Sequence, residues 1–343
     1  MSTRILVGDC RLTLPTLPER SVRCCVTSPP YWGLRDYGHG EQIGLEQTPD
    51  AYVAELVAVF REVRRVLTDD GTLWLNLGDS YSSMRDSKAT PDTLRGDSDG
   101  TAVAGAMNRN PAALRAAGLK HKDLVGIPWM LAFALRADGW YLRSDIIWHK
   151  PNPMPESVTD RPTKSHEYLF LLAKSERYYY DAAAIAEPLT ESSIERLSQP
   201  TLDTQVGSDR VPGKTNGNMK AVAKRSGNLE RVYGQNPSSP HRASGVPWEG
   251  TTRNKRTVWT VATQPFKGAH FATFPPALIE PCILAGSAKG DTILDPFGGA
   301  GTTALVADRL GRDAILCELN PTYAELAEQR VTSDSPLFSE VIR

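Results

Sequence analysis

Both ends of the chain alternate short apolar runs with longer amphipathic segments. Near the N-terminus, "RILVGD" and "VRCCVTS" are typical of strands, and "GTLWLNLGDSY" predicts a third. Between the last two, "DAYVAELVAVFREVRRVL" repeats apolar residues at helical spacing, with Asp50 as the expected N-cap. This alternation of strands and helices predicts an α/β fold built on a parallel sheet.

The same alternation returns twice further along. Residues 123–186 contain a predicted helix, "VGIPWMLAFALRADG", and then two strands, "YLRSDIIWHK" and "HEYLFLLAKS". Pro128 suits the first turn of that helix, where a missing N–H costs nothing. Residues 257–330 are expected to form three helices and two strands in alternation: "PPALIEPCILAGS", "DTILDPF", "GTTALVADRLG", "DAILCEL" and "PTYAELAEQR".

Two stretches lack this periodicity. Residues 83–122 are rich in Ser, Asp, Gly and Thr, and we expect a long mobile loop there. Residues 190–256 are dense in Pro, Gly, Asn and Ser. Between 210 and 256, ten basic residues and two acids (Glu230 and Glu249) give a local charge of +8; the basic residues are Arg210, Lys214, Lys220, Lys224, Arg225, Arg231, Arg242, Arg253, Lys255 and Arg256.

Composition narrows the class of protein. The chain has 343 residues, 40% of them apolar, and a net charge of −1, so only local charge could indicate a nucleic-acid partner. The five cysteines show no paired spacing, which favours buried thiols in a reduced compartment over a zinc site. No signal peptide and no run of about 20 apolar residues is present, so we expect a soluble cytoplasmic protein without a metal.

A glycine-rich turn is the first strong chemical signal. In "DTILDPFGGAGTTALVADRLGRDAILCEL", Gly299, Gly301 and Ala304 fit the nucleotide-binding fingerprint between a strand and a helix. Glu318 follows Asp295 by 23 positions, which suits an acid that binds ribose hydroxyls. No Lys follows the glycines, so a P-loop is excluded. The carboxylate of Asp295 before the turn suits a cationic amino group better than a pyrophosphate.

A stiff turn, "TSPPYW" at residues 27–32, ends the second predicted strand. Pro29 and Pro30 have no N–H to donate, so neither a strand ladder nor a helix interior can include them. The turn therefore holds a hydroxyl, a carbonyl and two aromatic rings at the end of a strand.

These two motifs together resemble those of the amino-directed DNA methyltransferases, which use S-adenosylmethionine. The family's D-P-F-x-G-x-G-T-T loop stands here at Asp295–Thr303, and its [S/D/N]-P-P-[Y/F] loop at Ser28–Tyr31. The resemblance extends to "RILVGD", "RVLTDDGTLWLNLGDSY", "GWYLRSDIIWHKPNPMPES", "SHEYLFLLAKS" and "AHFATFPPALIEPCI". It covers most of the chain outside 83–120 and 190–256, and the order of the motifs is that of the permuted beta group.

The resemblance implies a Rossmann-like methyltransferase sheet with circularly permuted motif order and a small irregular target-recognition region. It divides the chain into six parts: a catalytic half at 1–82, the mobile loop at 83–122, the rest of the catalytic half at 123–189, the target-recognition region at 190–256, the cofactor-binding half at 257–330 and a tail at 331–343. For the region 190–256, a solvated linker is the alternative.

The resemblance also implies roles for individual residues. Ser28, Pro29, Pro30 and Tyr31 would be catalytic. The cofactor would contact Asp9, His270, Phe274, Asp295, Pro296, Phe297, Gly299, Gly301, Thr302, Thr303 and Glu318, with Asp9 near the adenine. The substrate would contact Trp32, Asp79, Trp148, Lys150, Asn152, Lys224, Arg225 and Arg253.

The chemistry of a base amine explains the S-P-P-Y loop. The lone pair of an exocyclic amine is delocalised into the ring, so fixed acceptors that hold its hydrogens favour attack on the methyl donor. The Ser28 hydroxyl and the rigid Pro29 carbonyl are suitable acceptors. Tyr31 offers a face for a base that has been flipped out of the duplex.

Several alternatives remain open. In this family S-P-P tends to accompany cytosine N4 methylation, whereas D-P-P and N-P-P tend to accompany adenine N6 methylation, so Ser28 favours cytosine. A cytosine C5 enzyme needs a cysteine nucleophile, and Pro281–Cys282 lies in an apolar helix where a buried thiol is expected. A non-catalytic DNA-binding regulator is the rival from another class. The expected partners are double-stranded DNA and a companion restriction endonuclease, with the enzyme a monomer or a homodimer.

Overall fold

The computed structural model describes residues 1–33, 42–82, 111–197, 251–264, 273–334 and 340–342. The strands are β1 (Ser2–Val7), β2 (Val22–Thr27), β3 (Leu67–Leu77), β4 (Tyr141–His149), β5 (His166–Ala173), β6 (Glu187–Pro188), β7 (Thr252–Arg253), β8 (Val258–Thr260), β9 (Thr292–Asp295), β10 (Asp313–Glu318) and β11 (Glu340–Ile342). The helices are α1 (Cys10–Thr13), the 3₁₀ turn Leu14–Thr16, α2 (Pro49–Val66), α3 (Pro111–Ala116), α4 (Ile127–Ala137), α5 (Glu191–Leu197), α6 (Pro276–Gly286), α7 (Thr302–Arg309) and α8 (Pro321–Asp334).

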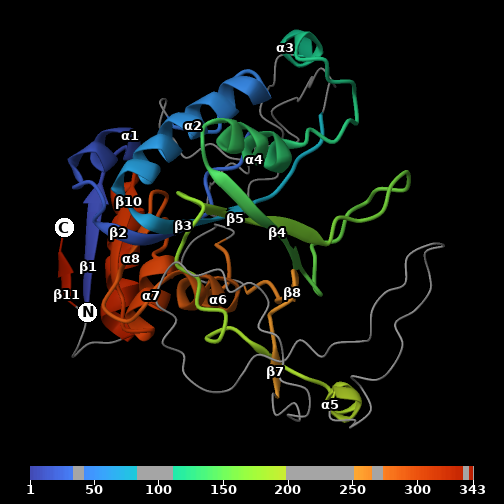
Figure 1. Cartoon of the computed structure of the whole chain (residues 1–343). Coiled ribbons are helices and arrows are strands. Elements are labelled where there is room, and N and C mark those ends of the chain that lie inside the picture. The colour runs from blue at the N-terminus through green and yellow to red at the C-terminus, as the bar shows by residue number, and fades with distance from the viewer. Residues whose placement is uncertain (34–41, 83–110, 198–250, 265–272, 335–339, 343) are drawn as a thin grey trace. The chain divides into compact units, whose positions relative to one another are not determined.

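One large sheet joins the two ends of the chain (Figure 1). Within the described residues its strand order is β11-β1-β10-β9-β2-β3-β5-β4-β8. All neighbours are parallel except β5, which is antiparallel to both β3 and β4. Strand β9, from the C-terminal part, pairs with β2 on one side and β10 on the other. The predicted Rossmann-like sheet with permuted motif order is therefore confirmed.

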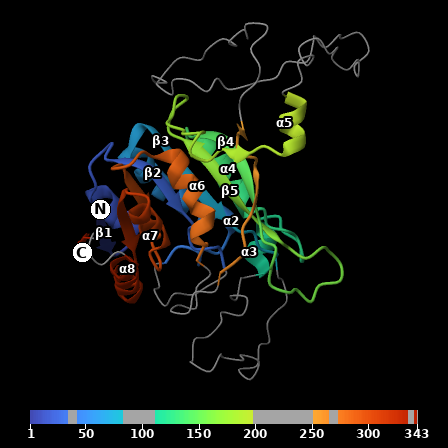
Figure 2. The ribbon, with the colours of Figure 1, turned by 90° about the horizontal axis from the view of Figure 1, so that it is seen from below.

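Helices cover both faces of this sheet. Helices α2 and α4 pack together and contact β3 and β4 on one face, and α6, α7 and α8 lie on the other, in front of the sheet in Figure 2. The main apolar cluster lies under α2 and α4, where Tyr52, Leu56 and Phe60 of α2 are fully buried. Their spacing of four residues is the helical period that the sequence shows.

The start of α2 corrects one prediction. Thr48, not Asp50, is the N-cap, because its side-chain oxygen accepts the backbone N–H of Ala51 at 3.2 Å. Pro49 occupies the first helical position, where its fixed φ and missing N–H are tolerated. The N-cap therefore lies two residues before the expected one, and Asp50 falls in the first turn, where its charge suits the helix dipole.

Two segments expected to be irregular contain regular structure. Helix α3 lies within the predicted loop 83–122, and β11 lies within the predicted tail 331–343 and pairs in parallel with β1. Both elements are short, with six and three residues, so neither repeats often enough to give a periodic signal. The rest of the predicted loop, residues 83–110, lies outside the described residues.

Residues 182–255 form a compact unit of their own, and residues 1–181 with 256–343 form the other. In the smaller unit β6 pairs antiparallel with β7, and Glu187 forms ion pairs with Arg253 at 3.4 Å and Lys255 at 3.8 Å. Helix α5 was not predicted. The boundaries of this unit lie near those of the expected target-recognition region. That the region recognises the target, and the alternative that it is a solvated linker, both stay predictions. Residues 198–250, with most of the basic cluster, lie outside the described residues.

Candidate active site

Four loops at the carboxyl ends of parallel strands form one pocket. They follow β1, β2, β9 and β10, and the pocket therefore opens where the order of the parallel sheet reverses, between β9 and β2. Ligands in open α/β sheets bind at this point, because the adjacent loops diverge there. The pocket gathers twelve of the residues singled out from the sequence: Asp9, Ser28, Pro29, Pro30, Tyr31, Phe274, Asp295, Pro296, Phe297, Gly299, Thr302 and Glu318.

Other expected site residues lie elsewhere. Gly301 and Thr303 support the pocket from behind without lining it, and Arg253 belongs to the smaller unit. Three fall outside the described residues: Lys224, Arg225 and His270.

The glycine-rich turn after β9 is shaped by close packing. Gly301 has φ +74°, and a Cβ added there would lie 2.8 Å from the Cβ of Ala327 in α8, so only glycine fits. The backbone N–H of Gly299 donates to Glu318 Oε2 at 2.7 Å, which joins the turn to the end of β10. Arg330 of α8 donates to Ala300 O and Thr302 Oγ1 at 3.1 and 2.8 Å. The turn is thus held open as a cradle that a ligand can approach.

Asp295 is a buried carboxylate at the bottom of this cradle. It is 2% exposed and accepts the hydroxyls of Thr27 and Thr303 at 2.6 and 2.7 Å, as well as the N–H of Phe297 at 3.0 Å. Burial raises the pKa of Asp295 to about 6, and these hydrogen bonds only partly offset that effect. A carboxylate with so perturbed a pKa in a pocket is typical of a functional group.

Asp9, after β1, also lines the pocket. Its carboxylate caps α1 by accepting the N–H of Arg11 and also forms a 2.6 Å ion pair with the Arg11 guanidinium. Burial alone would raise the pKa of Asp9, but the hydrogen bonds and charge of Arg11 outweigh it and lower the pKa. Asp9 therefore stays ionised, with its charge partly compensated by Arg11.

The S-P-P-Y loop is held by α2. The hydroxyl of Tyr52 donates to the Pro30 carbonyl at 2.8 Å, which fixes the turn from behind. No donor among the described residues bonds the Pro29 carbonyl, and Ser28 and Pro29 both line the pocket. The structure thus offers one carbonyl of the proline pair to a ligand and uses the other to anchor the turn.

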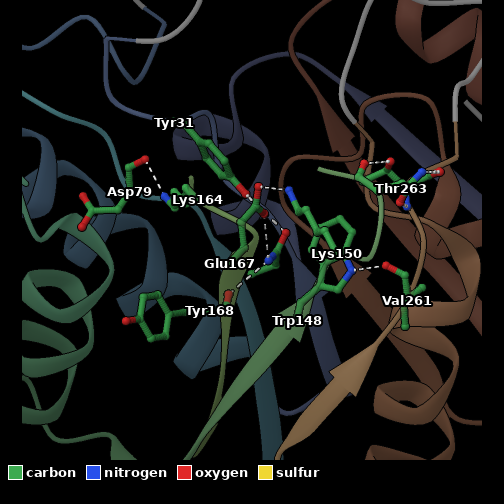
Figure 3. Close-up of polar contacts among 11 residues, drawn as sticks. Tyr31, Asp79, Trp148, Lys150, Lys164, Glu167, Tyr168, Val261 and Thr263 are labelled. Carbon is green, nitrogen blue, oxygen red and sulfur yellow. Dashed lines mark hydrogen bonds and ion pairs between the residues drawn. The ribbon is translucent and has the colours of Figure 1, made fainter. Parts of the chain in front are cut away.

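Tyr31 is positioned by contacts on the neighbouring strands (Figure 3). Its hydroxyl donates to Glu167 Oε2 at 2.7 Å and lies 3.3 Å from Asn76 Oδ1. A Cβ at Gly78 would lie 2.6 Å from the Tyr31 ring, so the absence of a side chain there makes room for the tyrosine. Burial, followed by the charge of Glu167, raises the pKa of Tyr31, and the phenol stays protonated. Its ring therefore has a fixed place in the pocket wall.

Glu167 links Tyr31 to Lys150. Its other carboxylate oxygen accepts the Lys150 ammonium, which also lies 4.3 Å from the centre of the Trp148 ring (Figure 3). The two partners of this ion pair are 15% and 18% exposed, so solvent screens the pair only weakly. Because Glu167 contacts Tyr31 and does not line the pocket, the geometry makes it a positioning residue.

We predict that Glu167→Gln lowers kcat about tenfold without changing the Kd for the expected cofactor, S-adenosylmethionine. The amide keeps the shape but replaces a charge-assisted hydrogen bond of about 1.5–3 kcal/mol with a neutral one. Tyr31→Phe should cause a similar loss, and the double variant should lose little more, because both remove the same contact. Turnover assays and calorimetry measure the two quantities.

Glu62→Gln, at a partly exposed ion pair with Arg65, is the matched control for that test. An additive double variant would contradict the role of Glu167 in positioning Tyr31.

Trp32, which was expected to contact the substrate, lies in the core. It is 2% exposed, and its indole N–H donates to the Glu46 carbonyl at 2.8 Å. A polar partner for the indole allows the whole ring to enter the core. Trp32 therefore anchors the S-P-P-Y loop from below.

Asp79, expected at the border of the active site, caps α4. Its carboxylate accepts the N–H groups of Gly126 and Ile127 at 3.0–3.2 Å, and its carbonyl accepts the Lys164 ammonium at 2.8 Å. These contacts satisfy donors that a helix N-terminus leaves unpaired. They give Asp79 a structural role that the sequence did not indicate.

Trp148 and Asn152 also use their polar groups within the protein. The Trp148 indole donates to Val261 O at 2.8 Å, and Asn152 exchanges two hydrogen bonds with the backbone of Thr263. Neither residue lines the pocket, and neither does Lys150. Contact of these three side chains with a target base stays a prediction.

Sequence reasoning missed several supporting residues. Tyr52, Gly78, Glu167 and Arg330 each act through a partner far away in the chain, so no local motif marks them. Arg11 could have been found, because it follows Asp9 by two residues at a strand end.

The cysteines do not supply a C5-type nucleophile. Cys282 lies in α6 with 0% exposure, and its thiol bonds Leu278 O one helical turn away. All five thiols are buried, and burial raises the pKa of Cys317, at the pocket wall, to about 12. Within the described residues no cluster of three or more His, Cys, Asp or Glu side chains could hold a metal ion, and no helix is long and apolar enough to cross a membrane.

Known proteins share these features. The family model N6_N4_Mtase, DNA methylase, matches residues 22–329. The chain is 47% identical to the type II methyltransferase M.XycI of Xanthomonas campestris pv. cyanopsidis, covering 98% of this chain and 89% of that one. It is 45% identical to M.Cfr9I of Citrobacter freundii, covering 95% and 87%.

Solved structures agree with the fold. A protein of Thermus thermophilus described as a putative DNA modification methylase, in complex with S-adenosyl-L-methionine, has a TM-score of 0.55 and 26% identity, covering 99% of this chain and 98% of that one. The PvuII DNA methyltransferase (cytosine-N4-specific) has a TM-score of 0.58 and 18% identity, covering 96% and 86%. The fold, the pocket and these matches together identify the chain as a member of the DNA methylase family that uses S-adenosylmethionine.

Proposed function

We propose that this protein methylates the N4 amine of a cytosine flipped out of a specific site in duplex DNA. The observation that carries the proposal is the shared pocket, in which Ser28 and Tyr31 lie together with Asp295 and Glu318 although 268 residues separate the strands of the two loops. A donor of methyl groups and an acceptor amine can therefore meet in one cavity.

The pocket residues suit both the ammonium group and the ribose of the cofactor. The cradle after β9 lets a ligand approach the backbone at Gly299, and Asp295 offers a carboxylate to an ammonium group. Glu318 lies at the end of β10, where an acid suits ribose hydroxyls. When bound, S-adenosylmethionine supplies an electrophilic methyl group on a sulfonium.

The S-P-P-Y loop acts on the acceptor. The Ser28 hydroxyl and the Pro29 carbonyl accept the amine hydrogens, which turns the nitrogen lone pair toward the methyl donor. Because Tyr52 and the prolines already fix the turn, little reorganisation is needed during transfer. Tyr31 supports the base by stacking, held in place by Glu167.

Ser28 favours cytosine over adenine. Its neutral hydroxyl stands where adenine N6 enzymes of this family tend to carry Asp or Asn, and where cytosine N4 enzymes tend to carry Ser. Adenine N6 methylation is the second candidate, and the same pocket would serve it.

The methylated base tests this assignment. DNA incubated with the enzyme and S-adenosylmethionine, hydrolysed and analysed by nucleoside mass spectrometry, should contain N4-methylcytosine. N6-methyladenine in its place would overturn the cytosine assignment, and no methylation at all would favour the non-catalytic regulator. DNA treated with a Ser28→Ala variant provides the background.

We further propose that the enzyme protects one sequence from a companion endonuclease, because relatives of similar length are named type II methyltransferases. In this proposal the unit 182–255 contacts the bases of that sequence. Arg253, close to the C-terminal end of this unit, is one of the contacting residues. Methylation-sensitive sequencing of host DNA with and without the protein should reveal one modified motif. Scattered methylation would contradict site specificity.

A further inference from the structure

The loop between β4 and β5, residues 150–165, extends beyond the tip of β4 as a light-green finger in Figure 1. Strand β5 is antiparallel to both β3 and β4, so β4 runs parallel to β3 and ends at the same edge of the sheet. That edge carries the S-P-P-Y loop and the glycine-rich turn. The finger therefore begins at the same edge of the sheet as the active-site pocket, and its first residue, Lys150, is linked to Tyr31 through Glu167.

Contacts at its root and along its length keep the finger in place. Asn152 exchanges hydrogen bonds with the backbone of Thr263 at 3.0 and 3.2 Å. Glu156 accepts Arg161 at 2.7 Å and the N–H of Lys164 at 3.2 Å, which ties its outgoing and returning halves together. Three prolines in its first half restrict φ: Pro151, Pro153 and Pro155. These hydrogen bonds and prolines restrict the conformations of the finger, so its tip can keep its position when it contacts a partner.

Met154 lies between two of these prolines with 85% of its surface exposed. This is the highest exposure among the large hydrophobic side chains of the described residues, above Leu12 at 74%. Burial of a methionine side chain is favourable because it removes apolar surface from water. The finger thus presents a large apolar group that gains stability only when a partner covers it.

We propose that Met154 is a wedge that enters the base stack of DNA beside the flipped nucleotide. Methionine is among the apolar side chains that proteins insert between base steps, where burial of the wedge offsets part of the cost of unstacking. Met154 lies four positions after Lys150, a span of at most about 14 Å. This reach is similar to the roughly 12 Å width of the major groove. The proposal rests on base flipping by the DNA methyltransferase and holds for either target amine.

The test compares two duplexes that contain the methylated motif. One has a normal base pair at the target, and the other has an abasic position opposite it, so the target is already unpaired and costs less to flip. Met154→Ala should methylate the paired duplex on the order of tenfold more slowly than the wild type, and the unpaired duplex at nearly the wild-type rate. Met154→Leu should retain most activity on both, and Ser157→Ala, an exposed neighbour in the same loop, should retain all of it.

Three results would overturn the wedge: wild-type rates for Met154→Ala on the paired duplex, an equal loss on both duplexes, or weaker binding of S-adenosylmethionine. An equal loss would indicate a general DNA contact. If mass spectrometry finds N6-methyladenine, the same pair of duplexes is built around adenine. The identity of the methylated base therefore tests the cytosine assignment, and the ratio of the two rates tests the wedge.

Discussion

Ser28→Ala is expected to lower the rate of methyl transfer about a hundredfold while the Kd for S-adenosylmethionine stays unchanged. In the proposed mechanism the Ser28 hydroxyl holds a hydrogen of the target amine and so contributes only when the base is in place. Single-turnover assays with labelled cofactor and duplex DNA measure the transfer rate, and calorimetry measures cofactor binding. A transition-state contact predicts a fall in kcat without a matching rise in the cofactor Kd.

Two further variants make the result specific. Ser21→Ala changes an exposed serine that directly precedes the first residue of β2, at the end of the strand away from Ser28. This variant should leave both quantities unchanged. Ser28→Thr restores a hydroxyl and should recover part of the rate. A Ser28→Ala enzyme with wild-type kcat would contradict the assigned role, and equal rates for the Thr and Ala variants would show that the hydroxyl is not the relevant group.

The sheet could be predicted because its elements repeat a pattern many times. Helix α2 has 18 residues and β3 has 11, so apolar spacing is unambiguous in both. Elements of three to seven residues, such as β11 and α5, form where register with a neighbour or local packing allows, and their sequences carry no period. Tertiary context decides such elements, and one sequence does not contain that context in readable form.

The pocket could be predicted where its residues form contiguous motifs. Ser28 and Asp295 each belong to a short loop whose residue order reflects its chemistry. Glu167 could not be found this way, because its partner Tyr31 lies 136 residues earlier and only the fold joins them. The burial of Trp32 could not be found for the same reason, since its hydrogen-bond partner, the Glu46 carbonyl, lies on a later loop.

Binding of S-adenosylmethionine is expected to weaken as the pH falls below about 6, with a Kd roughly tenfold higher at pH 5 than at pH 7. Burial raises the pKa of Asp295 to about 6, and only the ionised carboxylate attracts an ammonium group. Asp9 stays ionised over this range because Arg11 lowers its pKa below the ordinary value of 3.8. Calorimetric titration of the enzyme with S-adenosylmethionine from pH 5 to pH 7 measures the dependence.

Asp295→Asn separates the charge from the shape of the site. The amide can keep hydrogen bonds with the hydroxyls of Thr27 and Thr303, so the pocket should persist while cofactor affinity falls at pH 7 and no longer varies between pH 5 and pH 7.

The ionised Asp295 carboxylate has the opposite effect on the stability of the fold. Because the folded pKa lies above the ordinary value of 3.8, the ionised carboxylate destabilises the fold progressively as the pH rises from about 4 to about 6. Asp295→Asn should therefore be at least as stable as the wild type at pH 7 in thermal unfolding. A variant that binds the cofactor as tightly as the wild type would contradict a contact between Asp295 and the ammonium group, and a less stable variant would show that the carboxylate is kept for the fold.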